Sequence, residues 1–493
     1  MRLFKVFFLS LLLSATGAGA AQDYNLPSIG QPADNVLSPA EEKRIGQRVV
    51  SQLKAQGMIL EDPELEAYVA DIGWRLAEHT ERPPSDFTFF VIDDPSVNAF
   101  ALPGGYIGVN AGLLLETETE SELAGVVAHE IAHVTQRHIA RQIEATQGLT
   151  WVTAAAVLLA IIAGGGDPSV VQAALTMGMS NLGQQQINFT RQHELEADRL
   201  GIHTLARAQY NPNGMADFFR KMERRSRLYG NRLPEILLTH PVSDTRISEA
   251  ESRIRDLHVE TVHESEDYAL MRARARVLSS KQPSDAVTYF EEKRRRAETG
   301  DPATDYGYAL ALTRVGRLER SHAILADLAG REAAHPHYAL AYARVLLDQG
   351  QGGEALEVLA DVRPRHPSYL PMTLAYAEAL IVNDRAADAR NYLMDKRRLV
   401  ENNADANRLL ARAADKEGRL AEAHYRDARY FFLRGNHAAA IHRLQAGLKL
   451  PDLSQDDKAR LEAALREYRG DCHDKLSERE CRERVEGTGS RRY

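Results

Sequence analysis

Small residues recur at a fixed interval through the C-terminal half of this 493-residue chain. One register, with members 34 residues apart, holds Ala275, Ala309, Ala343, Ala377 and Ala411. Two further registers follow the same interval and hold Gly316, Gly350, Asp384 and Gly418, and then Ser321, Ala355, Ala389 and Ala423. Small side chains at these positions let the two helices of a pair approach closely, and each pair buries its apolar face against the next pair. The pattern predicts an all-α solenoid of stacked helical pairs.

An interval of 34 residues is that of tetratricopeptide repeats, which we assign to residues 268–450. Because solenoid repeats pack mainly on one another, we expect the preceding part of the chain to fold by itself. Residues 451–493 are rich in charge and predict a polar C-terminal tail. The only two cysteines, Cys472 and Cys481, lie in that tail. In an oxidising compartment they predict one disulfide.

The first 20 residues have the pattern of a cleaved signal peptide. Arg2 and Lys5 precede an apolar run at residues 6–13, and Ala18 and Ala20 flank a glycine in a small-residue cleavage site. The run is too short to cross a bilayer. We therefore expect a secreted protein, most simply in a bacterial periplasm. The formal net charge of −8 argues against general nucleic-acid binding.

The region between the leader and the repeats, residues 21–262, predicts an α+β domain with a small sheet. Residues 87–92 predict a strand, and residues 98–115 predict a hairpin-like strand region that turns at Pro103-Gly104-Gly105. One helix is expected over residues 121–143 and another over residues 192–207. With the repeats, this gives a mainly α protein.

The helix expected at 121–143 contains the run His129-Glu130-Ile131-Ala132-His133. Positions i and i+4 share one helix face, so His129 and His133 can offer two imidazoles to one tetrahedral Zn²⁺. Glu130 lies beside that face, where it can deprotonate a water molecule at the metal. The alternative is a solvated His/Glu face, but the surrounding residues are apolar and favour a buried site.

A catalytic zinc wants a third protein ligand, and Glu194 on the helix at 192–207 is the best candidate. Asp198 follows four residues later on the same face, where its carboxylate can hydrogen-bond a ligand histidine. Three neighbours are expected to be bystanders: His138, five residues after His133 and turned off its face, and His193 and Glu196.

The run that contains His129 and His133, the Glu194-Leu195-Glu196-Ala197-Asp198 run, the stretch NAFALPGG at 98–105 and Thr239-His240-Pro241 together resemble a known family. This is the zinc endopeptidase family that includes the CAAX prenyl proteases and HtpX-type proteases. The resemblance implies a zincin-like metalloprotease domain with one zinc per chain, held by His129, His133 and Glu194. It also implies Glu130 as the general base and a supporting role for Asp198.

The same resemblance places His240 and Arg246 near the active site. Either side chain could stabilise the oxyanion of a tetrahedral intermediate. His240 could instead fill the fourth zinc position and hold the enzyme latent. The plainer alternatives are a loop histidine before Pro241 and, for Arg246, a surface residue of a helix.

Apolar residues at 149–182 predict a hairpin with a glycine-rich tip. It is either a buried helical hairpin or a mobile flap over the active site that also touches a membrane or an unfolded client. In an endopeptidase, we expect a substrate segment to lie extended along an edge strand near residues 98–102.

A signal peptide combined with tetratricopeptide repeats resembles one branch of the family. That branch implies a periplasmic endopeptidase for quality control and assembly of outer-membrane β-barrel proteins. Its clients would be unfolded or stalled outer-membrane proteins, and its repeats would bind the β-barrel assembly machinery. The alternative is a chaperone or adaptor that works through its repeats and carries a latent protease site.

Overall fold

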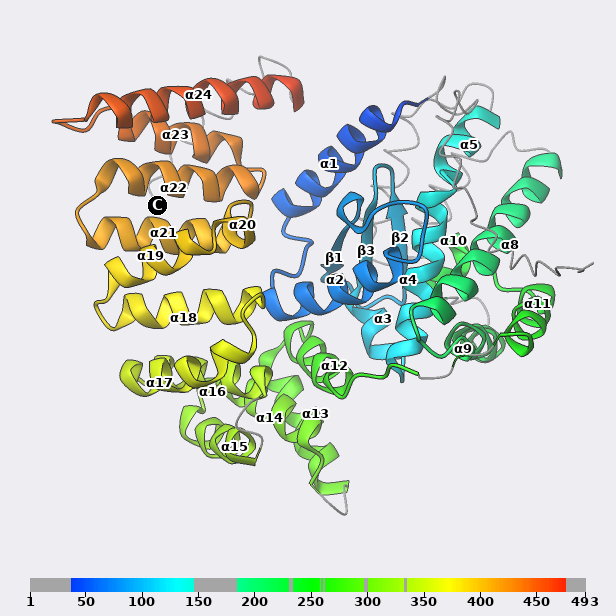
Figure 1. Ribbon diagram of the computed structural model, residues 1–493. Helices are drawn as coiled ribbons and strands as arrows, with labels where there is room; N and C mark the ends of the chain where they lie inside the picture. The colour runs from blue at the N-terminus through cyan, green and yellow to red at the C-terminus, as the bar shows by residue number, and fades with distance from the viewer. Residues whose placement is uncertain are drawn as a thin grey trace, which may run out of the picture.

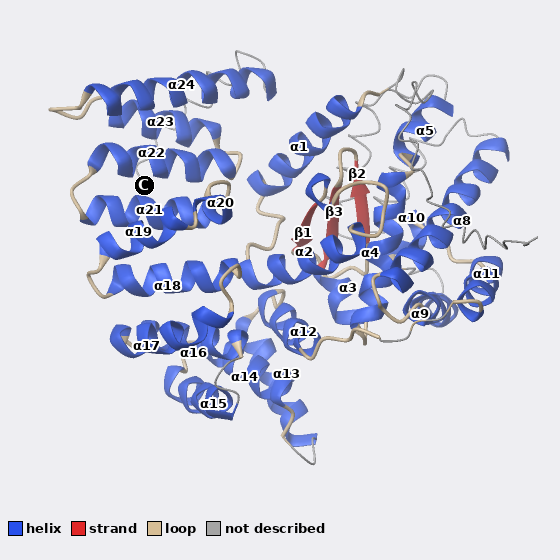
Figure 2. Ribbon diagram, in the orientation of Figure 1, coloured by secondary structure: helices blue, strands red, loops and turns tan. Residues whose placement is uncertain are grey.

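The computed structural model describes residues 37–145, 184–229, 234–257, 262–296, 300–331 and 335–475, together with residue 259. The expected signal peptide and the apolar hairpin at 149–182 lie outside these residues. Figure 1 shows a domain with a small sheet and, beside it, an arc of paired helices. Figure 2 shows that helices dominate both parts. The predicted fold class, a mainly α protein with an α+β domain before a helical solenoid, is confirmed.

The α+β domain contains the sheet and the helices that pack around it. Its elements are α1 (Pro39–Ala55), α2 (Pro63–Ala77), η2 (Pro84–Asp86), β1 (Thr88–Ile92), β2 (Ala99–Leu102), β3 (Tyr106–Asn110), α3 (Ala111–Glu116), α4 (Glu120–Thr135), α5 (His138–Ala145), α8 (Gln184–Arg207), α9 (Asn213–Tyr229), α10 (Glu235–Thr239) and α11 (Asp244–Arg255). Among the described residues, we find no helix long and apolar enough to span a bilayer.

The three strands lie in the order β1-β3-β2. β2 and β3 form the predicted antiparallel hairpin, and β1 joins β3 in parallel. The turn needs Gly104 and Gly105, whose φ angles are 80° and 89°, because L side chains rarely adopt such values. The strand region predicted up to residue 115 is too long. β3 ends at Asn110, and the apolar run after it forms α3, because a short apolar run has the same pattern in a buried strand and a buried helix.

The helix predicted over 121–143 is also corrected, because it breaks after Thr135. Arg137 adopts a left-handed conformation with φ 52°. Its guanidinium donates from Nη2 to the Leu37 carbonyl over 2.5 Å and from Nε to the buried Glu42 carboxylate over 3.0 Å. These contacts with the start of α1 hold the break, and α5 begins in a new direction at His138.

The repeats form paired helices with the predicted spacing. They comprise α12 (Asp267–Leu278), α13 (Pro283–Arg296), α14 (Pro302–Arg314), α15 (Leu318–Arg331), α16 (Pro336–Asp348), α17 (Gly352–Val362), α18 (Leu370–Val382), α19 (Ala386–Asp395), α21 (Ala404–Lys416), α22 (Leu420–Leu433) and α23 (His437–Gly447), with two short helical segments, η3 (Arg363–Arg365) and α20 (Arg397–Val400). The alanines of the first register are all buried. Gly316, Gly350, Gly418 and Asp384 all turn the chain with positive φ.

The segment expected to be a polar tail begins with a packed helix, α24 (Gln455–Lys475). Leu461, Tyr468 and Cys472 are buried, and the Tyr468 ring stacks on Phe432 with the centroids 3.9 Å apart. Apolar residues at helical spacing bury one face of this otherwise charged helix. Cys481 lies outside the described residues, so the disulfide stays a prediction.

The first repeats share a hydrophobic core with the α+β domain. That this domain folds by itself stays a prediction. Leu65 on α2 and Leu113 on α3 belong to the same buried cluster as Met271 on α12. The Tyr68 and Tyr268 rings stack across the boundary at 6.3 Å. Figure 1 shows the repeats passing α2 on their way round the domain.

An ion-pair network completes this interface. Arg274 on α12 donates from Nε and Nη2 to the Asp62 carboxylate over 2.7 and 2.8 Å, and its Nη1 lies 2.7 Å from Glu64 Oε1. His337 Nδ1 on α16 lies 2.6 Å from Glu64 Oε2. Burial alone would raise the pKa of Asp62, but the Arg274 guanidinium holds it below its usual value. Asp62 also caps α2 by accepting from the Leu65 amide, so one carboxylate serves both the helix and the interface.

We predict that Arg274→Ala will lower the free energy of unfolding by about 3–5 kcal/mol, because it leaves two buried carboxylates without their cation. Arg344→Ala is the matched control. Its side chain is 61% exposed and pairs with Asp348 and Glu378, so its loss should cost no more than about 1 kcal/mol. Urea unfolding followed by circular dichroism measures both. Equal midpoints for the two variants would contradict the prediction.

Candidate metal centre

The site depends on a close crossing of α4 and α8. Gly201 on α8 lies directly against the backbone of α4, where an added Cβ would stand 3.2 Å from the His129 nitrogen and 3.3 Å from the Ala128 carbonyl carbon. The small residue lets the two helices approach. The crossing brings Glu194 and Asp198 of α8 to His129 of α4.

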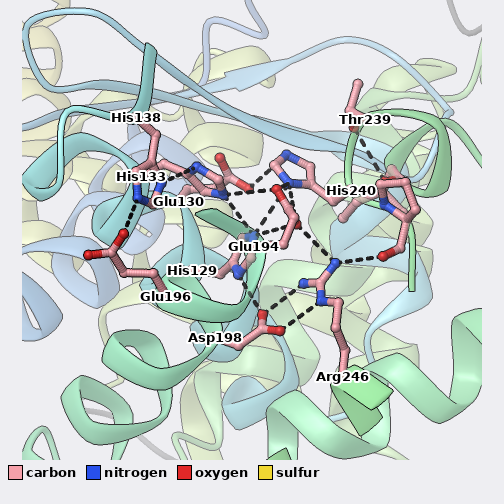
Figure 3. A network of polar contacts seen from close by, with 12 residues as sticks. His129, Glu130, His133, His138, Glu194, Glu196, Asp198, Thr239, His240 and Arg246 are labelled. Carbon is pink, nitrogen blue, oxygen red and sulfur yellow. Dashed lines mark hydrogen bonds and ion pairs between the residues drawn. The ribbon is translucent and has the colours of Figure 1, made fainter. Parts of the chain in front are cut away.

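Four predicted ligands meet at this crossing (Figure 3). His129, His133, Glu194 and His240 each offer an atom, and these atoms all lie within 4.8 Å of one another. The two Nε2 atoms of His129 and His133 are 3.0 Å apart. They lie 3.5 and 3.4 Å from the Glu194 carboxylate oxygens. His240 approaches from the loop after α10, and its Nδ1 lies 3.0 and 3.1 Å from the same two oxygens and 3.3 Å from His129 Nε2.

The contacts at Nδ1 of the two α4 histidines indicate whether a metal ion fits between their Nε2 atoms. His129 Nδ1 lies 2.9 Å from Asp198 Oδ1, and His133 Nδ1 lies 2.9 Å from His138 Nδ1. We assign the ring protons of the neutral imidazoles to these Nδ1 atoms. Both Nε2 atoms then direct lone pairs into the same small space, which calls for a cation. Imidazole nitrogens with a carboxylate oxygen are a donor set that suits zinc.

The same carboxylates make His129 strongly basic when no metal is bound. Burial alone would lower its pKa, but Asp198 and Glu194 raise the pKa of His129 to about 10. A proton and a metal ion therefore compete for Nε2 of His129.

Glu130 is buried beside the cluster, 1% exposed. Burial raises its pKa, while His240 and His129 act in the opposite direction. His240 Nε2 lies 3.6 Å from Glu130 Oε1. The backbone amide of Ala101 on β2 donates to the Glu130 carboxylate, so the sheet edge and the proposed base are in direct contact. A carboxylate in this setting suits general base chemistry.

Arg246 is fully engaged with the cluster. It donates from Nε and Nη2 to the two Asp198 oxygens over 2.7 Å each, and Nη1 lies 2.9 Å from both Glu194 Oε2 and the Pro241 carbonyl oxygen. The side chain is buried, so the alternative of a surface helix residue is wrong. With its donors directed at Asp198, Glu194 and Pro241, the geometry favours a positioning role over oxyanion stabilisation.

Three residues expected to be bystanders lie against the cluster instead. His138 is 2% exposed, and its two ring nitrogens contact His133 and Glu196. The His193 ring stacks on His138 with the centroids 4.2 Å apart. Burial lowers the pKa of His138 to about 4, which keeps the imidazole neutral at pH 7. One straight helix over 121–143 does not predict these contacts, because the left-handed turn at Arg137 changes the direction of the chain before His138.

We predict that Glu194→Gln will weaken zinc binding by more than about a hundredfold, beyond the usual cost of losing an outer partner of a ligand. The substitution keeps the side-chain shape but removes the anionic donor. Glu249→Gln is the control, since Glu249 pairs with Arg199 on the outside of the same helix packing. Competition with a chromophoric chelator measures both affinities, and circular dichroism checks the fold. Equal affinities would remove Glu194 from the ligand set.

The part of the chain that holds this site is similar to known proteins. Residues 63–254, which include every residue of the cluster, match peptidase family M48. The chain is 35% identical over 320 residues to the beta-barrel assembly-enhancing protease of Escherichia coli (strain K12), covering 64% of each chain. It is 33% identical over 330 residues to the protein of that name from Yersinia pestis, covering 65% of this chain and 68% of the other.

A third relative is metalloprotease LoiP of Escherichia coli (strain K12), 27% identical over 245 residues, which are 49% of this chain and 87% of that protein. The chain spans 64% of the length of the Escherichia coli assembly-enhancing protease. The match across the metal centre and the extended similarity to the Yersinia protein lead to one conclusion. The chain belongs to peptidase family M48.

Proposed function

We propose that this protein is a zinc-dependent endopeptidase. The observation that carries the proposal is the convergence of His129, His133 and Glu194 on one small space, with Glu130 buried beside them. Three protein ligands and a fourth position available to water are the usual arrangement of a catalytic zinc site.

The residues around the space have separable tasks. When bound, zinc would polarise the scissile carbonyl and acidify a water molecule. Glu130 is placed to take a proton from the attacking water and to return it to the leaving amine. Among the described residues, no strand pairs with the outer edge of β2. An extended substrate segment can add to this edge. The hydrogen bond from the Ala101 amide would hold the edge at a fixed position relative to the Glu130 carboxylate.

We further propose that the resting site is closed by His240. Its Nδ1 points at Glu194 and His129, as a fourth ligand would, rather than away from the cluster. The cavity beside His129, Glu130 and His240 has a volume of about 20 Å³, enough for roughly one water molecule. A substrate would have to displace His240. His240 lies directly after α10 and next to Pro241, so a movement of this loop would displace it.

For the biological role, we propose action on outer-membrane β-barrel proteins in the periplasm. The names of the relatives from Escherichia coli and Yersinia pestis support the link to β-barrel assembly. The leader pattern at residues 1–20 supports export. Unfolded or stalled outer-membrane proteins would be the clients, and the repeats would contact the assembly machinery.

One observation favours a chaperone or adaptor as a second candidate function. A cleft of about 1320 Å³ lies between α2 and the repeats, with Trp74 and Tyr369 among its lining residues. Trp74 is 46% exposed, which is unusual for a large aromatic side chain. A cleft of this size could hold an unfolded segment without cleaving it.

We predict that Glu130→Gln will retain zinc and the fold but cut proteolysis by about a hundredfold or more, because the water loses its base. Labelled casein provides the activity assay, and suppression of the aggregation of an unfolded outer-membrane protein provides the binding assay. Lost cleavage with retained suppression would separate the two functions. Cleavage near the wild-type rate would place the active site elsewhere.

We predict that His240→Ala will raise basal proteolysis severalfold, because the fourth position becomes open to water. The control is His203→Ala, an exposed histidine of α8. The casein assay decides the sign. If His240 instead stabilises the oxyanion, the same variant will lose about a hundredfold in turnover, and the closed resting site is wrong.

A further inference from the structure

A second line of hydrogen bonds runs from the metal centre on the side away from Asp198. His133 Nδ1 lies 2.9 Å from His138 Nδ1, and His138 Nε2 lies 3.1 Å from Glu196 Oε2. The same Glu196 oxygen accepts from Arg141 Nη1 over 2.9 Å. Figure 3 shows the part of this line from the ligand His133 through the buried His138 to Glu196. The line ends at the ion pair of Glu196 with Arg141.

The protons of this line can be assigned from one end. If His133 presents a lone pair at Nε2, its single ring proton is on Nδ1 and is donated to His138. His138 must then accept at Nδ1, so its own proton is on Nε2 and is donated to the Glu196 carboxylate. Each ring nitrogen has one task, and the line is consistent from the metal side to the carboxylate.

His129 offers a direct comparison. Its Nδ1 meets the Asp198 carboxylate in one step of 2.9 Å, and Asp198 is held by Arg246. His133 has no carboxylate at that distance on its outer side among the described contacts, and it reaches Glu196 through His138. Each ligand histidine is thus connected, directly or through His138, to a carboxylate that is held by an arginine. A carboxylate behind a metal-bound imidazole fixes its tautomer and raises its basicity.

We propose that His138 is a positioning residue for the metal centre, which connects His133 to Glu196 and fixes the ring and tautomer of that ligand. The proposal rests on the zinc site proposed above. The left-handed turn at Arg137 aims His138 back at His133, and the parallel His193 ring holds the plane of His138. Glu194, Glu196 and Asp198 then have three different tasks on one helix: ligand, end of the longer line and end of the shorter line.

The test compares zinc affinities in the Glu130→Gln background, which removes the proposed general base and so keeps proteolysis out of the measurement. His138→Phe keeps a flat ring against His193 but removes both hydrogen bonds. It should weaken zinc binding by roughly 10–100-fold, while the urea midpoint of the zinc-free protein stays close to that of the parent. His138→Gln carries one acceptor and one donor on a flat amide, so it should restore most of the affinity.

Glu196→Ala tests the far end of the line. It should weaken zinc binding on its own, but it should add little to His138→Phe, because both changes interrupt the same connection. Glu196 is partly exposed, so this variant tests the line even if His138→Phe fails to fold. Additive losses, or wild-type affinity in both single variants, would overturn the line while leaving the zinc site intact. A parent protein that binds no zinc would overturn the zinc site and the line together.

Discussion

The packing of α8 against α4 is the constraint on which the metal centre depends. At the crossing, Gly201 brings two buried carboxylates, Glu194 and Asp198, against the backbone and imidazoles of α4. Buried carboxylates cost several kcal/mol each unless they are paired and hydrogen-bonded. Arg246 and the imidazoles supply those partners. The helix crossing, the ligands and the side chains that support them therefore form one arrangement, in which each buried carboxylate depends on its neighbours for hydrogen bonds and charge.

Much of this arrangement could be predicted from local spacing. The interval of four residues between His129 and His133, and between Glu194 and Asp198, puts each pair on one face of a helix. The repeats were predictable for the same reason, because their period is written in small residues such as Ala309 and Ala343 and in the turn glycines. These are properties of single elements, and a sequence states them directly.

The parts that could not be predicted depend on contacts between distant segments. The turn at Arg137 is held by Leu37 and Glu42, which lie 100 and 95 positions earlier in the chain. The residues beside Arg137 carry no pattern that predicts a left-handed conformation. Without that turn, His138 would point away from His133, which is why it was expected to be a bystander. The packed helix α24 is a different case. Leu461 and Tyr468 lie at helical spacing, but the charged composition of the segment favoured a polar tail over a packed helix.

The core shared by α2, α3 and α12 has a consequence for how genetic data on such a protein would be interpreted. Residues such as Met271 and Tyr268 belong to the repeats by period but to the α+β domain by packing. A random substitution there would disturb the elements that support the zinc ligands, although it lies far from them along the chain. A loss-of-function screen would therefore score part of the first repeat together with the active site. A hybrid protein with exchanged repeats would keep the whole shared core and the His337–Glu64 contact only if the joint were placed after α16.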